Sequence, residues 1–87
     1  MNRKQKLINR LKSRPRDMTF DEVETLLSLL GFKRSNQGKT SGSRVKFTRI
    51  DNGRKINVTL HRPHPGNILQ IYQIVEVIKQ LEKEGLI

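Results

Sequence analysis

The segment 44–61 constrains the fold of this chain more than any other, because apolar and polar residues alternate in it on both sides of Asn52-Gly53. The apolar positions of this alternation are Val45, Phe47, Ile56, Val58 and Leu60. A period of two places one face of a strand in a core and the other face in water. Asn-Gly is the strongest two-residue hairpin signal, because both central residues of the turn take a positive φ. We therefore expect a β-hairpin that is buried on one face only.

The turn also predicts how the two strands pair. With Asn and Gly as the loop residues, Phe47 lies opposite Val58, and a shift by one residue would set apolar against polar side chains throughout. On the wet face, the same register places Arg44 opposite His61. Arg49 falls opposite an apolar residue, a mismatch that strand twist near the turn would relieve. The wet face is basic and polar, so we look for function there.

The charge of the chain is strongly positive and unevenly distributed. Its 87 residues include 18 Lys and Arg against 8 Asp and Glu, which gives a formal net charge of +10. Residues 1–16 carry seven basic residues and no acidic one, and residues 32–64 carry nine basic residues against Asp51 alone. Such a surface is typical of proteins that bind a nucleic-acid backbone, and an acidic protein partner would also fit it.

Composition limits the classes of protein to which the chain can belong. It contains no cysteine, which excludes disulfides and thiolate metal sites and is compatible with a reducing compartment. No apolar run approaches the roughly 20 residues that span a bilayer, and the N-terminus lacks the apolar segment of a secretory signal. At this length we expect a small domain with a thin core, cytoplasmic and without a membrane partner.

The N-terminal residues predict a short basic helix. Residues 3–13 place Leu7, Ile8 and Leu11 on one narrow face, surrounded by Lys and Arg. A helix of this length is marginal alone, so we expect it to dock weakly or to bind a partner. Pro15 prevents its continuation. We therefore divide the chain into a basic extension, residues 1–16, and a main domain, residues 17–87.

The main domain is expected to begin with a second helix. Thr19 and Glu22 form a capping-box signature, and Gly31 is a natural residue to end the helix. Between them an apolar stripe recurs at helical period, formed by Phe20, Val23, Leu26, Leu27 and Leu30. We expect this helix to cover the buried face of the sheet. Its acidic first turn suits the helix dipole, which is a structural and not a catalytic role.

The chain is expected to end with a third helix. Asn67 is its expected N-cap and Gly85 its end, and Tyr72 lies one step off the apolar stripe. The stripe consists of Ile71, Ile74, Val75, Ile78 and Leu81. Residues 32–36 fit a short first strand. The predicted fold class is α+β, in the order α-β-β-β-α after the basic helix, with a three-stranded antiparallel sheet and helices on one face.

Few residues offer chemistry. His61 and His64 both lie in the segment that leaves the hairpin, but no third ligand is nearby and two imidazoles do not make a stable metal site. No pair of carboxylates lies in the hairpin. The glycine-rich loop 37–43 lacks the P-loop spacing and is interpreted as a hairpin-entry loop. We therefore expect neither a metal nor another cofactor.

Four short motifs, in this order, resemble the HicA toxin family. They are LLGF at the end of the capped helix, GSRVKF at the start of the hairpin, HRPHPG after it, and EGLI at the C-terminus. The resemblance runs from about Thr19 to Ile87. It implies a fold like that of the double-stranded-RNA-binding domain, metal-independent cleavage of messenger RNA (mRNA), and neutralisation by a HicB antitoxin.

Position 44 departs from the family pattern. Family members commonly carry a catalytic histidine after Gly-Ser or Gly-Thr, whereas here Arg44 follows Ser43. An arginine stays protonated and cannot act as a base, but it can pair with a phosphate oxygen and stabilise developing charge. Either the protein binds RNA without cleaving it, or His61 and His64 supply the chemistry. The residues expected to bind RNA are Lys39, Ser43, Lys46, Lys55 and Arg62.

The two histidines suit an acid–base pair. Both stand near prolines, which favour extended or polyproline backbone, and a three-residue repeat would direct both side chains the same way with Cα atoms about 9 Å apart. RNA cleavage needs an acceptor for the 2′-OH proton and a donor for the leaving 5′-oxygen. We predict His61 as the acceptor and His64 as the donor; the alternative makes His64 the base and leaves His61 to position the loop.

Three functions therefore remain open. The first is an RNA-cleaving toxin of the HicA type, held inactive by a HicB-like antitoxin. The second is a non-catalytic binder of double-stranded RNA or DNA that uses the same basic face. The third is a protein-interaction module for an acidic partner. The order of the family-like motifs favours the first.

Overall fold

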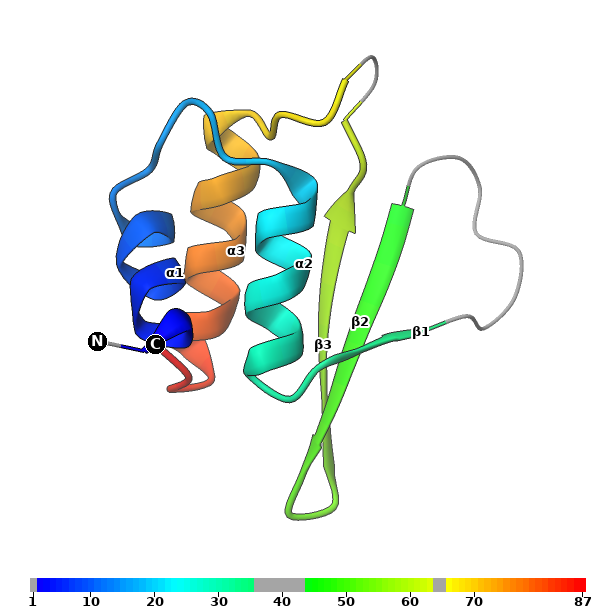
Figure 1. Ribbon diagram of the computed structural model, residues 1–87. Helices are drawn as coiled ribbons and strands as arrows, with labels where there is room; N and C mark the ends of the chain where they lie inside the picture. Colours follow the sequence, from blue (N-terminus) through cyan, green and yellow to red (C-terminus); the bar gives the residue numbers. More distant parts are fainter. Residues whose placement is uncertain (1, 36–43, 64–65) are drawn as a thin grey trace.

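The computed structural model describes residues 2–35, 44–63 and 66–87. Its helices and strands are α1 (Arg3–Lys12), α2 (Phe20–Leu29), β1 (Lys33–Ser35), β2 (Arg44–Asp51), β3 (Arg54–His61) and α3 (Ile71–Lys83). The strands form one antiparallel sheet in the order β1-β2-β3. The helices lie together on one side of this sheet (Figure 1). The predicted α+β arrangement is confirmed, and it is consistent with a fold like that of the double-stranded-RNA-binding domain.

The hairpin of β2 and β3 pairs in the register that the Asn-Gly turn predicts. Phe47 lies opposite Val58, and Asn52 and Gly53 both take a positive φ, of 52° and 79°. Arg49 lies opposite an apolar residue, as expected, and its polar end is accommodated by a hydrogen bond. The Nη1 of Arg49 donates to a backbone carbonyl at the end of α2, at 2.6 Å. A long cationic side chain thus stays on the buried face because its charged end reaches a helix C-terminus.

The helix α2 has the predicted ends. The Glu22 N–H donates to Thr19 Oγ1 at 3.1 Å, and the Thr19 N–H donates to Glu22 Oε1 at 3.0 Å, which completes the capping box. Gly31 follows the helix with a φ of +93°, the left-handed conformation common at this place. The apolar stripe is buried, and the ring centroids of Phe20 and Phe47 lie 6.4 Å apart. The helix therefore packs directly on β2.

The helix α3 begins later than the sequence predicts, and the prediction of Asn67 as its N-cap is wrong. The N-cap is Gln70, whose N–H donates to Gln73 Oε1 at 3.0 Å. The reason is tertiary: residues 67–69 form backbone hydrogen bonds with residues 18–20, including an antiparallel bridge. These bonds hold the segment extended, so helical backbone cannot start there.

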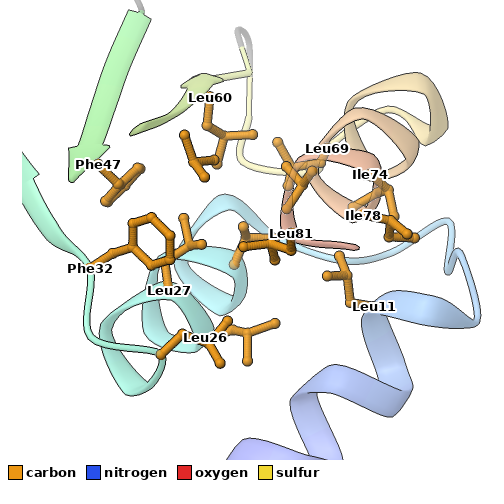
Figure 2. Close-up of a cluster of buried hydrophobic side chains, with 14 of the residues drawn as sticks. Leu11, Leu26, Leu27, Phe32, Phe47, Leu60, Leu69, Ile74, Ile78 and Leu81 are labelled. Carbon is orange, nitrogen blue, oxygen red and sulfur yellow. The ribbon is translucent and has the colours of Figure 1, made fainter. Parts of the chain in front are cut away.

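The core is shared by all three helices and the hairpin, and Figure 2 shows side chains from α1, α2, β2, β3 and α3 converging on it. The core residues of α3 are Ile74, Val77, Ile78 and Leu81. Ile71, expected in the stripe, is exposed, and Val75 is only half-buried. The buried face is rotated from the predicted one because α3 packs against α1 as well as against β3.

The helix α1 docks on the rest of the domain. Leu11 is completely buried and Ile8 nearly so. Arg10 adds two ion pairs, from Nε to Glu22 Oε2 at 2.7 Å and from Nη2 to Asp17 Oδ1 at 3.1 Å. The hydrogen bond from Arg10 lowers the pKa of Glu22. The first turn of α2 therefore has the structural role that the sequence predicts. No helix in the described ranges is both long and apolar enough to cross a membrane.

Candidate nucleic-acid interface

The two sides of the sheet differ in what they face. Alternation along paired strands places every second residue on the side away from the helices, and no described element covers that side (Figure 1). We call it the open face. Its residues are Lys33, Arg44, Lys46, Thr48, Ile50, Lys55, Asn57, Thr59 and His61.

The cations on the helix-facing side of the sheet have structural partners. Arg49 bonds to α2 as described, and Arg34 Nη1 lies 3.6 Å from Glu24 Oε2. Arg54, beside the turn, forms an ion pair with Glu84 at the end of α3. Their charge is therefore locally compensated.

The cations of the open face have no such compensation. Lys33, Arg44, Lys46 and Lys55 form no ion pair with a carboxylate among the residues that the structure describes. The only carboxylate of the hairpin, Asp51, belongs to the other side by strand alternation. Uncompensated positive charge on one surface attracts anions, and a polyanionic backbone most of all.

At one end of the open face, Arg44 and His61 stand directly opposite each other in the paired strands. Both side chains are exposed, and both line a groove of about 380 Å³. A neutral imidazole can take a proton, and a guanidinium beside it can bind a phosphate oxygen. The pair thus brings together a possible proton acceptor and a phosphate-binding cation, two of the groups that phosphodiester cleavage can use.

The groove lies along β3, the edge strand of the sheet, so its other wall comes from α3 on the helix-facing side. Tyr72, Glu76 and Gln80 line it at intervals of four residues, which places them on one face of the helix. Gln73 lies beneath them and is buried; its Nε2 donates to the backbone carbonyl of His61 at 2.9 Å. Because Gln73 Oε1 also holds the N-terminus of α3, one side chain joins the end of β3 to the start of α3.

The predicted site residues are distributed over several places. Arg44 and His61 meet in the groove, and Lys46 follows on the same face two positions away. Lys55 is also on this face, but at the turn end of the hairpin. The guanidinium carbon of Arg62 lies 5.0 Å from the centre of the Phe20 ring, which it covers on the helix side. Lys39, Ser43 and His64 lie outside the described residues.

Sequence reasoning missed several residues of this surface. Lys33 joins the open face only because β1 pairs with β2, and pairing partners in space are not visible in a local pattern. The wall formed by α3 was missed because the apolar stripe of that helix predicts only its buried side. Tyr72, an aromatic residue that is 65% exposed, was the one sequence signal for its other side. Within the described ranges, no group of three or more His, Asp or Glu residues is placed to hold a metal ion.

One comparison with known proteins gives a match. A family model described as the HicA toxin of bacterial toxin-antitoxin matches residues 20–83. The matched range runs from the first residue of α2 to the last residue of α3, so it includes the sheet and both walls of the groove, and α1 precedes it. Searches of the curated proteins and of the solved structures found no match.

Proposed function

The chain belongs to the HicA toxin family of bacterial toxin–antitoxin systems, and from this premise we propose that it is a ribonuclease that cleaves mRNA without a metal ion. One observation carries the proposal most directly: Arg44 and His61 face each other on the open basic face and line the same groove. The proposed activity implies a cytoplasmic location.

His61 is the proposed proton acceptor. A neutral imidazole carries a ring nitrogen with a free lone pair, which can accept a proton from a 2′-hydroxyl. The 2′-oxygen then attacks the adjacent phosphorus, the bond from phosphorus to the 5′-oxygen breaks, and a 2′,3′-cyclic phosphate and a 5′-hydroxyl result. Arg44 binds a non-bridging phosphate oxygen and stabilises the charge that develops on it.

The leaving 5′-oxygen needs a proton, and His64 is the proposed donor. This role rests on the sequence alone, from the three-residue spacing to His61 in a proline-rich segment. The reverse assignment, with His64 as the base and His61 positioning the loop, uses the same two side chains. A double variant tests both assignments together.

A second candidate function follows from position 44. Since the family's usual histidine is replaced there by Arg44, a protein that binds RNA without cleaving it would keep the basic face and lose the chemistry. The open face would serve both functions equally, because phosphate contacts bind and position RNA whether or not it is cleaved.

The proposed partner is a HicB-like antitoxin. Membership of a toxin–antitoxin family implies an antitoxin in general. A partner that presents acidic side chains to the open face would compensate the charges of Lys33, Lys46 and Lys55 and would exclude RNA from the same surface.

Incubation of single-stranded RNA with the purified chain in excess EDTA tests the proposal. The wild type and a Lys79→Ala variant, which changes an exposed residue outside the groove, should cleave. The double variant His61→Ala, His64→Ala should bind RNA and leave it intact. Binding without cleavage by the wild type would favour the second candidate function, and absence of RNA binding would contradict both.

A further inference from the structure

The residues of α3 that form one wall of the groove are largely exposed. Tyr72 is 65% exposed, Glu76 is exposed and Gln80 is half-exposed. The three nevertheless line the same groove as Arg44 and His61. A tyrosine normally buries its apolar ring body, so an aromatic ring left open beside cationic side chains indicates a surface for a ligand.

The two walls of the groove offer different chemical groups, and each group suits a different part of a ligand. The strand wall offers the cationic Arg44 and the imidazole of His61, which suit a phosphate. The α3 wall offers the aromatic face of Tyr72 and, one turn later, the carboxylate of Glu76. This carboxylate repels phosphate and accepts hydrogen bonds from amino groups. A nucleotide has this same division, with an anionic phosphate at one end and a flat base carrying N–H donors at the other.

The two walls are held at a set spacing before any ligand binds. Gln73 accepts a hydrogen bond from the Gln70 N–H at 3.0 Å and donates to the His61 carbonyl at 2.9 Å. Both contacts are made by a side chain that is only 8% exposed. A preformed groove loses less conformational freedom on binding than one that must be assembled.

We propose that this groove holds one unpaired nucleotide of single-stranded RNA, with its base stacked on Tyr72 and its phosphate on Arg44 beside His61. Bases in a duplex are already stacked on each other and cannot lie flat on a side chain, so the groove selects unpaired RNA over the duplex. The inference rests on the proposed function for its RNA substrate, and it goes further by naming the strand state and the residue that recognises it.

Intrinsic fluorescence gives a direct test in the full chain. The protein contains one tyrosine and no tryptophan, so its fluorescence reports on Tyr72 alone. A short single-stranded 2′-O-methyl RNA lacks the attacking hydroxyl and therefore stays intact with the wild-type protein. We expect it to quench the fluorescence on binding, whereas a duplex of the same length and the polyanion heparin should bind with little quenching.

Substitutions of Tyr72 give the second measurement. Base stacking on an aromatic side chain corresponds to about 5- to 150-fold in affinity per base. Tyr72→Ala should weaken binding of labelled single-stranded RNA by a factor in this range, and Tyr72→Phe, which keeps the ring, should restore it to within about threefold. Ile71→Ala is the matched control, because Ile71 is an exposed neighbour on α3 that does not line the groove.

The outcomes separate this inference from the proposed function. If the wild type binds and cleaves RNA but its fluorescence is unchanged and Tyr72→Ala binds normally, the groove does not hold a base, and only this inference fails. If Tyr72→Ala keeps RNA affinity and loses binding to the antitoxin, the groove is a protein site, and the inference is again overturned. If no RNA binds to any variant, the proposed function fails and the inference with it.

Discussion

The helix-facing side and the open face of the same hairpin use positive charge for different purposes. On the helix-facing side, Arg49 bonds to the end of α2, and Arg34 and Arg54 form ion pairs with glutamates of α2 and α3. On the open face, Lys46 and Arg44 have no carboxylate partner among the described residues. The helix-facing side carries three cations and the open face four, so the number of cations does not locate a binding surface. The absence of compensating carboxylates among the described residues does.

The same comparison separates stability from function. Residues of the helix-facing side remove apolar area from water and satisfy helix ends, which are contributions to the free energy of folding. Residues of the open face add little to packing and keep their side chains available. Substitutions on the helix-facing side should therefore change stability, and substitutions on the open face should change RNA binding and cleavage.

The largest effect is expected at the histidines of the open face. His61→Ala, alone or with His64→Ala, should lower the rate of RNA cleavage by roughly 10²–10⁴-fold, because it removes a general acid–base group. Urea midpoints should shift little, since the side chain of His61 is exposed. Wild-type cleavage should follow a bell-shaped pH profile. Full activity of the folded double variant would refute the catalytic assignment and return attention to Arg44.

A loss of stability is expected instead at Phe47, on the helix-facing side of the hairpin. Phe47→Ala removes a ring that is almost fully buried against Phe20 and should lower the free energy of unfolding by about 3–5 kcal/mol. Lys46→Ala, the adjacent residue on the open face, should change it by less than about 0.5 kcal/mol. Urea denaturation followed by circular dichroism measures both. Similar losses in the two variants would contradict the separation of the faces.

A smaller effect is expected from charge reversal along the open face. Lys46 lies two positions from Arg44, about 7 Å along the strand, whereas Lys55 lies six positions from His61, about 20 Å away. The screening length is about 10 Å at 0.1 M salt. Lys46→Glu should therefore weaken RNA binding about tenfold. The loss of affinity in Lys55→Glu should be severalfold smaller than that.

Fluorescence anisotropy at several salt concentrations measures this effect. Each lost phosphate contact should reduce the slope of log affinity against log salt by about 0.7 for single-stranded RNA. Arg49→Gln is the control from the other side of β2: it should lower stability and leave RNA affinity unchanged. A salt-independent affinity of the wild type would remove the electrostatic argument.

The smallest effect is expected within the helical layer, at Glu22. Its pKa is lowered by the hydrogen bond from Arg10, so its contribution to stability is present above the ordinary glutamate pKa of about 4.3 and is lost as the pH falls through the lowered value. The side chains of the pair are about one-third exposed, which reduces the expected effect. Glu22→Gln should cost about 0.5–1 kcal/mol at pH 7.

Urea denaturation of Glu22→Gln and of the wild type, repeated across the pH range, checks this prediction. The difference between the two proteins should vanish in strong acid, where the carboxyl of the wild type is also neutral. Thr19→Ala, which removes the other half of the capping box, should have an effect that depends less on pH, because the hydrogen bond of its side chain contributes least to the lowered pKa of Glu22. A pH-independent effect of Glu22→Gln would show that the cap, and not the ion pair, is the stabilising contact.

Local signals in the sequence determined a large part of the fold. The Asn-Gly turn and the period of two predicted the hairpin and its register, including the juxtaposition of Arg44 and His61. Thr19, Glu22 and Gly31 predicted both ends of α2. These predictions succeed because a tight turn, a cap and a periodic apolar face are decided by residues close together in the chain.

What only the tertiary structure decided involves residues far apart in the chain. Backbone bonds between residues 67–69 and 18–20 moved the start of α3 from Asn67 to Gln70, and packing on two neighbours rotated its buried face. The same helix then brings Tyr72 to the groove of His61, and pairing of β1 adds Lys33 to the open face. Such placements depend on which elements meet and at what angle. The arrangement that forms is the one of lowest free energy for the whole core, and it cannot be predicted from any local pattern.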